Sequence, residues 1–338
     1  MKAAFLYGLR DIRVEEVSEP GPEDGQVLIA PRVVGICGSD MNMYRRGPMT
    51  SHPLVIGHEC CGHIVKLGKG VTDFEVGQRV VIQPNCGCGN CLLCRMGRDN
   101  QCPSRISLGV TVDGCFAEYV KAPARYVWPM ADDISDEEGA LVEPLAVAVG
   151  AVRRMDNPAG RRVMIFGAGT IGLLVAQLLK LNGATVFLAD LIERNLLLGK
   201  QLGADEVINV SKYDPKEGAV SLTGGKGIDV VVETAGITKT FEQAIEIVNS
   251  GGRIILIGLP HDVANIPPET IVRKEIEIFG SFIYSYEDFY RAMQIIKKVE
   301  ISPLISHRFP LENIGQAFNI LEKGEGIKVV INLKKEVG

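Results

Sequence analysis

The amino-acid sequence predicts an α/β protein of two domains, a β-rich, barrel-like domain and a doubly wound domain built on a parallel sheet. Two patterns carry this prediction. Short apolar runs separated by turns fill the first part of the chain, and strands and helices alternate regularly after it. The length of 338 residues fits two domains, each long enough to bury a core.

The first part of the chain, up to about residue 145, has the pattern of an antiparallel barrel or sandwich. Its strands are rich in valine, isoleucine and aromatic residues, and turns of glycine, proline and aspartate separate them. The predicted strands with the clearest pattern are residues 26–36, 63–68, 78–84, 115–123 and 125–130.

After Glu143-Pro144 the chain alternates strands and helices, which is typical of a parallel sheet covered on both faces. The predicted strands are residues 161–166, 184–190, 205–210, 227–236, 253–259 and 275–282, and the predicted helices are 145–155, 170–183, 193–203 and 239–251. Two further helices, 285–299 and 313–324, and a last strand, 328–333, should return to the first domain. We therefore expect one domain at 1–146 with 285–338, and the other at 147–284.

Composition and charge argue against several kinds of partner. The net charge of −5 at pH 7 gives no electrostatic reason to expect a nucleic acid or a membrane surface as a partner. No apolar run reaches the ~20 residues that span a bilayer, and residues 1–13 lack the pattern of a signal peptide. These observations favour the cytoplasm, where clustered cysteines are more often metal ligands than disulfides. The odd number of cysteines, nine, also argues against complete pairing.

The densest motif is a cysteine-rich run in which Cys88, Cys91, Cys94 and Cys102 follow the spacing C-x2-C-x2-C-x7-C. Short C-x2-C steps bring thiolates onto one turn, where they can surround a single metal ion. An iron–sulfur electron carrier is an alternative from another class of protein, because this run before Cys102-Pro103 is similar to that of ferredoxins. The long gap before Cys102 and the absence of a second run count against it.

A dinucleotide fingerprint follows the first strand of the alternating part. Residues Gly167-Ala168-Gly169-Thr170-Ile171-Gly172 form G-x-G-x-x-G between the apolar strand VMIF and the helix LLVAQLL. The glycines let the backbone approach a pyrophosphate, and the helix N-terminus offers free N–H groups. The next strand ends at Asp190, whose carboxylate would bind a ribose 2′-hydroxyl and repel a 2′-phosphate. We therefore predict NAD rather than NADP, although the nearby Arg194 could soften that preference.

Three further segments carry residues that can bind zinc: Cys37 in GICGSD, His58 and Glu59 in GHE, and Glu143 in LVEP. A catalytic zinc site leaves one position for water or substrate. Taken alone, Cys37 could equally be a buried, inert thiol. Glu143 could equally stabilise a helix N-terminus. From the residues alone, these alternatives stay open.

Taken together, the motifs resemble those of the zinc-dependent medium-chain alcohol dehydrogenases. The shared elements occur in the family's order: Cys37-Gly38-Ser39-Asp40, Gly57-His58-Glu59, the cysteine run, Glu143-Pro144 and Gly167–Gly172. The chain most resembles the polyol branch (sorbitol, threonine and butanediol dehydrogenases), which has Glu-Pro where liver-type enzymes carry a cysteine ligand. The resemblance covers essentially the whole chain. It implies a GroES-like catalytic domain and a Rossmann NAD-binding domain.

The resemblance also implies two zinc ions per subunit. Cys37 and His58 would hold a catalytic zinc, with Glu143 as a further ligand, direct or through water. Glu59 would be either a direct ligand or one that exchanges with water, and Ser39 would bond the substrate oxygen. The closed structural site would be formed by Cys88, Cys91, Cys94 and Cys102. Cys86 lies outside that spacing, and we interpret it as a free thiol or a substitute ligand.

The implied reaction is hydride transfer between a secondary alcohol, such as a polyol, sugar acid or sugar-derived alcohol, and NAD. Zinc acts as a Lewis acid that favours ionisation of the alcohol, and the cofactor carries the redox chemistry. Many relatives complete the proton relay with a histidine five residues after the cysteine ligand, where this chain has Asn42. His52 is a candidate replacement by proximity in sequence, although an ordinary loop histidine is the simpler interpretation.

A second departure concerns the substrate. Sorbitol dehydrogenases have an Arg-Tyr pair after the last sheet strand, where this chain has Ile283-Tyr284. That difference puts sorbitol itself in doubt and keeps threonine or butanediol open. Arg45 and Arg46 follow the Cys37 loop and could face an anionic substrate, or could simply be solvated.

The family implies a homo-oligomer, a tetramer or a dimer. A third hypothesis is a protein that binds NAD but has lost catalysis. The complete set of predicted zinc ligands argues against it.

Overall fold

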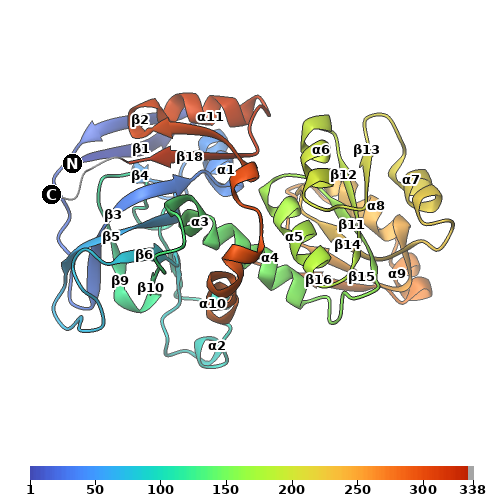
Figure 1. The fold of residues 1–338 in the computed structure, drawn as a ribbon, viewed down its shortest axis with the longest axis horizontal. Coiled ribbons are helices and arrows are strands. Elements are labelled where there is room, and N and C mark those ends of the chain that lie inside the picture. Colours follow the sequence, from blue (N-terminus) through green and yellow to red (C-terminus); the bar gives the residue numbers. More distant parts are fainter. Residues whose placement is uncertain (334–338) are drawn as a thin grey trace. The chain divides into compact units, whose positions relative to one another are not determined.

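The computed structural model describes residues 1–333, and the chain divides into two compact units (Figure 1). The first unit comprises residues 1–143 with 301–338, and the second comprises 144–300. The chain therefore leaves the first unit once and returns to it once. The last five residues of our expected domain at 285–338 lie outside the described residues.

The described part of the first unit is built mainly from two antiparallel-rich sheets. One has three strands in the order β2-β1-β4, and the other has seven, in the order β10-β6-β5-β3-β18-β17, with β9 pairing β3. Their bounds are β1 Lys2–Gly8, β2 Asp11–Glu16, β3 Gln26–Gly35, β4 Leu54–Val55, β5 Glu59–Leu67, β6 Arg79–Ile82, β9 Val120–Pro123, β10 Val127–Pro129, β17 Ile305–Pro310 and β18 Lys328–Asn332. A short hairpin pairs β7 Asn85–Cys86 with β8 Ile106–Ser107.

The carboxyl-terminal part of the chain completes this unit, because β18 runs antiparallel to β3 and parallel to β17. Alternate residues of these strands point into one core, in which Val27, Ile29, Ile64 and Val329 are fully buried. The helices of this unit are α1 Gly38–Arg46, α2 Leu92–Arg95, α3 Asp136–Ala140 and α11 Ile314–Glu322, with short 3-10 turns at Asp99–Gln101, Ala124–Tyr126, Ser302–Leu304 and Leu311–Asn313.

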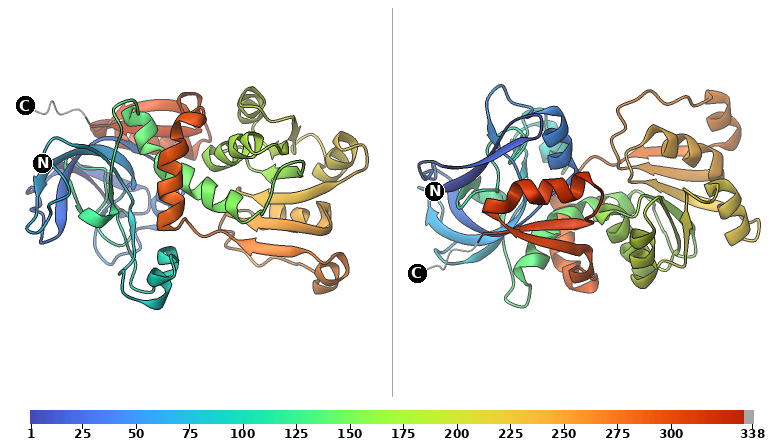
Figure 2. Two further views of the ribbon diagram at one scale, coloured as in Figure 1. Left: turned by 60° about the horizontal axis from the view of Figure 1, so that its bottom comes forward. Right: turned by 90° about the horizontal axis from the view of Figure 1, so that it is seen from above.

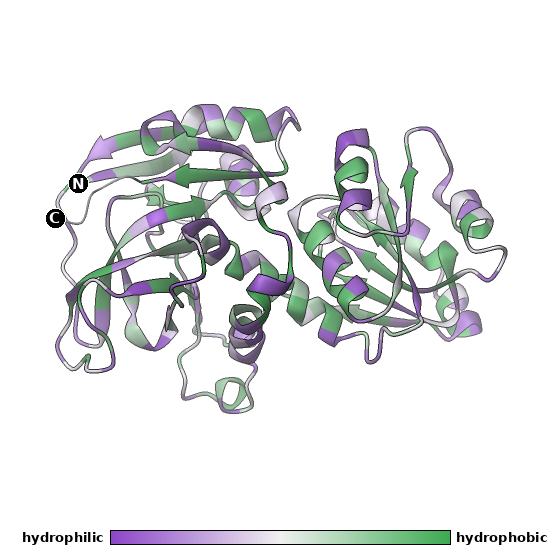
Figure 3. Cartoon of the chain, viewed as in Figure 1, coloured by the Kyte–Doolittle hydropathy of each residue, from purple (hydrophilic) through white to green (hydrophobic). Residues whose placement is uncertain are grey.

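The second unit has a parallel sheet of six described strands in the order β13-β12-β11-β14-β15-β16. This order, with the first strand at the centre, is that of the Rossmann fold. The strands are β11 Arg162–Phe166, β12 Thr185–Asp190, β13 Glu206–Asn209, β14 Ile228–Glu233, β15 Val248–Leu256 and β16 Glu277–Gly280. These strands are largely apolar along their length, as the hydropathy colouring shows (Figure 3). Continuous apolar strands are expected where both faces of a sheet are covered.

Helices lie on both faces of this parallel sheet (Figure 2). The described helices of the second unit are α4 Val142–Arg153, α5 Thr170–Leu181, α6 Glu193–Gln201, α7 Pro215–Leu222, α8 Thr238–Ile247, α9 Pro268–Lys274 and α10 Tyr286–Ile295, with a 3-10 turn at Ile296–Lys298. Helix α4 begins in the first unit, and most of it belongs to the second. No helix among the described residues is long and apolar enough to cross a membrane.

The chain returns to the first unit at residue 301, later than the return at 285 that we expected from the sequence. Helix α10 accounts for the difference. Its Asp288 is fully buried and pairs with Arg153 of α4 at 2.9 Å, and its N-cap, Ser285, accepts a hydrogen bond from Asp288 N. These contacts hold the helix within the second unit.

Candidate functional site

The four cysteines of the C-x2-C-x2-C-x7-C run come together in the structure. The Sγ atoms of Cys88, Cys91, Cys94 and Cys102 all lie within 4.8 Å of one another, and those of Cys91 and Cys102 are 3.8 Å apart. Four sulfurs at ~2.3 Å around one zinc ion in tetrahedral geometry would be separated by ~3.8 Å. Among residues 1–333, no other group of three or more candidate donors is gathered this closely.

Backbone N–H groups prepare these sulfurs for a cation. Cys91 N donates to Cys88 Sγ at 3.4 Å, and Cys88 N donates to Cys102 Sγ at 3.3 Å. Hydrogen bonds from the N–H groups of Asn90 and Cys91 lower the pKa of Cys88 to about 6. Cys88 therefore favours the thiolate, the form that binds metal, whereas burial raises the pKa of Cys94 to about 12. The four donors of the cluster leave no position for a substrate.

Cys86 is not part of this cluster. Its side chain is buried on β7 and lies 3.6 Å from the carbonyl oxygen of Gln83 and 3.7 Å from that of Pro84. Burial raises the pKa of this thiol to about 12. Cys86 is therefore a packed, protonated thiol, which agrees with the first of our two interpretations.

The second group of predicted ligands begins where β3 ends. Cys37 lies at the N-cap of α1, and its backbone N–H donates to Asp40 Oδ2 at 2.8 Å. Asp40 is fully buried, and its other oxygen accepts a hydrogen bond from Gly57 N at 3.2 Å. One carboxylate thus joins the turn that carries Cys37 to the turn that carries His58.

His58 is buried between the residues of these two turns. Its Nδ1 lies 3.4 Å from Asp40 Oδ1 and its Nε2 lies 3.4 Å from Ser39 Oγ. Burial lowers the pKa of His58, but the negative charges of Asp40 and Cys37 outweigh burial and hold that pKa well above its ordinary value. The imidazole therefore lies against Cys37, with Nδ1 facing a carboxylate, which is the usual way in which a zinc-binding histidine is oriented.

The turn before His58 requires glycine. Gly57 has a φ of 90°, and a Cβ at this position would lie 2.7 Å from the ring of Phe116. The packed aromatic ring and the positive φ together fix the direction in which His58 leaves the turn.

Glu59, the next residue, forms a buried ion pair with Lys328 at the start of β18. Lys328 Nζ lies 2.7 Å and 2.6 Å from the two carboxylate oxygens and also donates to the carbonyl oxygen of Ile36 at 2.9 Å. The two side chains are 3% and 1% exposed, so water contributes little to their solvation. A Cβ on Gly35 would lie 2.0 Å from Glu59 Oε2, so glycine is needed opposite this carboxylate.

Glu143 completes this neighbourhood from the first turn of α4. It is buried, and its charge, like those of Glu59 and Cys37, contributes to a raised pKa of Lys328 although burial alone would lower that pKa. Lys328 therefore lies within electrostatic reach of three of the four predicted ligands of the catalytic zinc. Both oxygens of Glu59 bind Lys328, so the set with the chemistry best suited to a metal ion is Cys37, His58 and Glu143.

Asp40 and Lys328 also belong to this site, and neither was predicted from the sequence as part of it. Asp40 belongs to the quoted motif Cys37-Gly38-Ser39-Asp40, and its position three residues after an N-cap is a signal for a capping carboxylate. Lys328 had a weaker signal, a single charge at the start of the apolar strand KVVIN. Its partner Glu59 lies 269 residues away along the chain, a separation that sequence patterns do not report.

In the second unit the dinucleotide fingerprint has the geometry that its glycines predict. Gly167 has a φ of 99°, and a Cβ on Gly172 would lie 1.9 Å from the carbonyl oxygen of Gly167. Gly169 is the N-cap of α5, and no side chain caps that end of the helix. The N-terminus of α5 therefore has no side-chain cap, and its backbone N–H groups lie where a pyrophosphate would approach.

Asp190 ends β12 beside this turn. Its Oδ2 accepts a hydrogen bond from Ala168 N at 2.6 Å, and its Oδ1 accepts one from Ile192 N at 2.8 Å. The carboxylate borders a cavity of about 310 Å³ whose lining includes Phe166, Gly167, Leu191, Val210, Ile237 and Thr240. A predominantly apolar cavity with one acid at its edge suits a purine and its ribose.

Comparisons with known proteins match both parts of the chain to dehydrogenase families. The family described as "Alcohol dehydrogenase GroES-like domain" matches residues 23–132, and the family described as "Zinc-binding dehydrogenase" matches residues 170–298. Sorbitol dehydrogenase of Bacillus subtilis is 34% identical over 344 residues, which cover 98% of this chain and 97% of that protein. The chain belongs to the zinc-dependent medium-chain alcohol dehydrogenases.

Solved structures of other dehydrogenases have the same fold. An Escherichia coli oxidoreductase/dehydrogenase of unknown specificity superposes with a TM-score of 0.94 and 32% identity, covering 99% of each chain. The (2R,3R)-butanediol dehydrogenase of Bacillus subtilis superposes with a TM-score of 0.90 and 32% identity, covering 98% of this chain and 99% of that chain. The family and the fold class that the sequence predicted are therefore confirmed.

The other residues singled out from the dehydrogenase motifs lie as follows. Asn42 lies on α1 and is partly buried, and His52 is exposed. Arg45 is exposed, 3.7 Å from Glu322, and Arg46 is exposed next to it. Arg194 lies on α6, where its Nε donates to Asn195 Oδ1 at 3.4 Å.

The segment that replaces the Arg-Tyr pair has an unusual backbone. Ile283 has a φ of 44°, which is rare for a β-branched residue because its side chain crowds the backbone there. Tyr284 is fully buried, with its ring centre 5.5 Å from that of Phe289. The tyrosine is therefore a core residue of the second unit.

Proposed function

We propose that this chain is a zinc- and NAD-dependent dehydrogenase that oxidises a secondary alcohol, a polyol or a sugar-derived alcohol. The observation that carries the proposal is the shared neighbourhood of Cys37, His58 and Glu143. His58 lies against Cys37, and Cys37 and Glu143 both act on the buried Lys328, although the three side chains are not gathered as closely as the four cysteines. A thiolate, an imidazole and a carboxylate form a three-ligand set that leaves the fourth zinc position open. The family, with sorbitol and butanediol dehydrogenases among its members, supports this interpretation.

Cys37, His58 and Glu143 would hold the zinc ion, which would supply Lewis acidity, and NAD⁺ bound at Gly167–Gly172 would be the hydride acceptor. Asp40 Oδ1, 3.4 Å from His58 Nδ1, would orient the imidazole, and Nε2 would be the nitrogen that holds the metal ion. Lys328 neutralises Glu59 and adds positive charge near Cys37 and Glu143. Ser39 Oγ, 3.4 Å from His58 Nε2, is placed to accept the proton that an alcohol loses there.

Beyond Ser39, proton transfer would not use the side chain at position 42, because Asn42 has a neutral amide that does not titrate. The exposed His52 is the candidate for the group that completes the proton relay. If it completes the relay, the pH profile of turnover in the wild-type enzyme shows a single histidine transition, and His52→Ala removes that transition. If water completes the relay, the two profiles coincide.

The second zinc ion would lie among Cys88, Cys91, Cys94 and Cys102 and would have a structural role. The same four sulfurs could hold an iron–sulfur cluster in principle, but a colourless protein that contains zinc would eliminate that alternative. Membership of the dehydrogenase family supports zinc.

NAD would bind at Gly167–Gly172 with its ribose at Asp190. The exposed Arg194 lies on the next helix, where it could partly offset repulsion of a 2′-phosphate. We therefore expect a preference for NAD that Asp190→Ala weakens, raising the ratio of the kcat/KM with NADP⁺ to that with NAD⁺ by about tenfold or more. An unchanged ratio would mean that another residue selects the cofactor.

We propose the substrate by its chemical class, a polyol or a sugar-derived alcohol. Ile283 replaces the arginine that sorbitol dehydrogenases have at this position. Its apolar side chain offers no hydrogen bond to a hydroxyl group of a substrate. An activity like that of butanediol or threonine dehydrogenases is therefore the second candidate. We further propose a cytoplasmic homo-oligomer, a tetramer or a dimer, which light scattering of the purified protein would distinguish.

The experiment that tests the proposal measures NAD⁺ reduction with a panel of polyols, sugar acids, sugar phosphates, threonine and butanediol. Glu143→Ala should lose zinc or activity, whereas Glu75→Ala, an exposed glutamate of the same unit, should keep both. Activity with no alcohol, in a protein that holds zinc and NAD, would favour the non-catalytic alternative. Full zinc and activity in Glu143→Ala would contradict the ligand assignment.

A further inference from the structure

Helix α3 (Asp136–Ala140) directly precedes Glu143, so its position determines where that carboxylate lies. The helix has five residues and is too short to be stable by itself. A capping box closes its first turn, because Glu138 N donates to Ser135 Oγ at 3.2 Å and Ser135 N donates to Glu138 Oε2 at 2.8 Å. The cap fixes the shape of the turn, and its place in the unit must come from other contacts.

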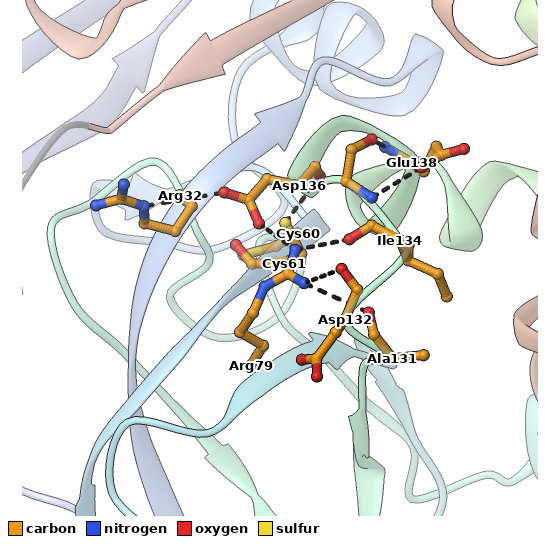
Figure 4. Close-up of polar contacts among 10 residues, drawn as sticks. Arg32, Cys60, Cys61, Arg79, Ala131, Asp132, Ile134, Asp136 and Glu138 are labelled. Carbon is orange, nitrogen blue, oxygen red and sulfur yellow. Dashed lines mark hydrogen bonds and ion pairs between the residues drawn. The ribbon is translucent and has the colours of Figure 1, made fainter.

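Arg79 on β6 supplies most of those contacts (Figure 4). Its Nη2 donates to the carbonyl oxygen of Ile134 at 2.7 Å and to Asp136 Oδ1 at 2.8 Å. Its Nη1 lies 3.4 Å from the carbonyl oxygens of Ala131 and Asp132. One planar guanidinium thus holds the whole segment that leads into α3, which the compact ammonium group of a lysine could not do.

Three other strands hold the same helix. Arg32 Nε on β3 lies 4.0 Å from Asp136 Oδ2, and Cys61 Sγ on β5 donates to the carbonyl oxygen of Asp136 at 2.8 Å. Arg308 on β17 pairs with Glu137 through two hydrogen bonds, of 2.6 Å and 2.9 Å. Consecutive acids of the first turn are therefore tied to separate strands of one sheet.

Two of these strands also position the other predicted zinc ligands. Strand β3 carries Arg32 and ends at Gly35, just before Cys37, and β5 begins at Glu59 and carries Cys61. The register pairs Gly35 with Glu59 and Val33 with Cys61. The contacts of α3 therefore link the segment that leads to Glu143 to β3 and β5, the two strands next to Cys37 and His58.

We propose that Arg79 and Asp136 are positioning residues that hold Glu143 in register with Cys37 and His58 for zinc binding. This inference rests on the proposed role of Glu143 as a ligand. From α3 the chain passes through Leu141 and Val142, both fully buried, so a displacement of the helix is transmitted to Glu143 rather than absorbed by a loop.

A purely structural role would give a different result. The side chains of Arg79 and Asp136 are 25% and 31% exposed, and ion pairs with this exposure contribute little to stability. If the pair of Arg79 and Asp136 only stabilised the fold, its removal would change the melting temperature slightly and leave the affinity for the catalytic zinc unchanged. A positioning pair lowers the affinity of the catalytic zinc, because outer-shell substitutions typically weaken metal binding by about 10–100-fold.

The test measures zinc release by chelator competition at low temperature, where circular dichroism shows each variant folded. In Arg79→Met we expect release of one zinc ion per subunit at an about tenfold lower chelator concentration, with release of the four-cysteine zinc unchanged. Arg79→Lys should be intermediate. Arg13→Met, which removes an exposed pair with Asp11, is the matched control and should release both ions as the wild type does.

The double variant Arg79→Met/Glu143→Ala separates the two hypotheses. If Arg79 acts through Glu143, the double variant binds the catalytic zinc no more weakly than Glu143→Ala alone. Wild-type zinc affinity in Arg79→Met, or additive losses in the double variant, would overturn the positioning role. Unchanged affinity in Glu143→Ala would instead overturn the ligand assignment, whatever Arg79→Met does.

Discussion

The two proposed metal sites of this molecule are built in opposite ways. The four-cysteine site is local, since its ligands lie within 14 residues of one another and backbone N–H groups point at the sulfurs. The proposed catalytic site is assembled from segments far apart in the sequence, and charged residues surround it, including a lysine 269 residues from its partner. A local set with a donor in every position suits a structural ion. A dispersed set with an open position suits a reaction.

The largest expected effect separates the two sites by activity. Cys37→Ser should remove the catalytic zinc and lower kcat/KM by about a thousandfold or more, since a Lewis acid contributes several kcal/mol to the transition state. The four-cysteine zinc should remain, so metal analysis should find one ion fewer per subunit. Two ions per subunit together with unchanged turnover would show that Cys37 is an inert buried thiol.

The reciprocal substitution tests the structural role of the cysteine cluster. Cys94→Ser should lose the other zinc ion and lower the melting temperature by about 10 °C, because structural zinc contributes directly to folding. Turnover per folded molecule, measured well below that temperature, should stay within about twofold of the wild type. A large loss of turnover in the folded variant would mean that the cluster takes part in the reaction.

The buried ion pair at the catalytic site should be a strong determinant of stability. Lys328→Met leaves Glu59 charged and without a partner in the interior, which should cost about 3–5 kcal/mol in urea unfolding. Lys328→Met/Glu59→Gln should recover most of that loss, because neither member is then charged. A single variant as stable as the wild type would show that Glu59 finds another partner, such as the metal.

The same pair predicts a pH dependence. The folded protein raises the pKa of Lys328, so the stabilisation is fully present below the ordinary pKa of 10.5 and is lost as the pH rises through the folded value. The wild type should therefore lose stability in strongly alkaline solution, and Lys328→Met/Glu59→Gln should lose less of it there. Parallel alkaline unfolding curves for the two proteins would contradict this assignment.

The smallest expected effect concerns the cysteine outside the cluster. Cys86→Ala removes one buried sulfur and should lower stability by about 1–2 kcal/mol, with no change in zinc content. The matched variant within the run is Cys94→Ser, which should lose an ion. Loss of zinc in Cys86→Ala would identify Cys86 as a substitute ligand.

Local motifs could be predicted from the sequence because their parts are close along the chain. The cysteine spacing predicted one cluster, and G-x-G-x-x-G with Asp190 predicted a strand, a glycine turn and a helix that the structure contains. The alternation of strands and helices predicted the parallel sheet, since continuous apolar strands need helices on both faces.

The elements that sequence reasoning missed depend on tertiary contacts or on weak local signals. No helix was predicted over residues 38–46, which form α1, because its N-cap is a cysteine rather than one of the usual capping residues. The helix predicted over 239–251 ends at Ile247, because Val248 to Leu256 form β15 and pair with β14. The α3 contacts and the partner of Glu59 lie in no motif, because each joins segments far apart in sequence.

The most direct test of the comparison is zinc X-ray absorption of the wild type and of Cys37→Ser. We predict a mixed shell for the wild type, with sulfur at about 2.3 Å and nitrogen or oxygen at about 2.0–2.2 Å, and a shell of sulfur alone for the variant. Such a change would assign the nitrogen and oxygen ligands to the site of Cys37 and the sulfur-only site to the cysteine cluster. Identical spectra and equal zinc content in the two proteins would contradict the central claim that Cys37 holds a second, chemically distinct zinc ion.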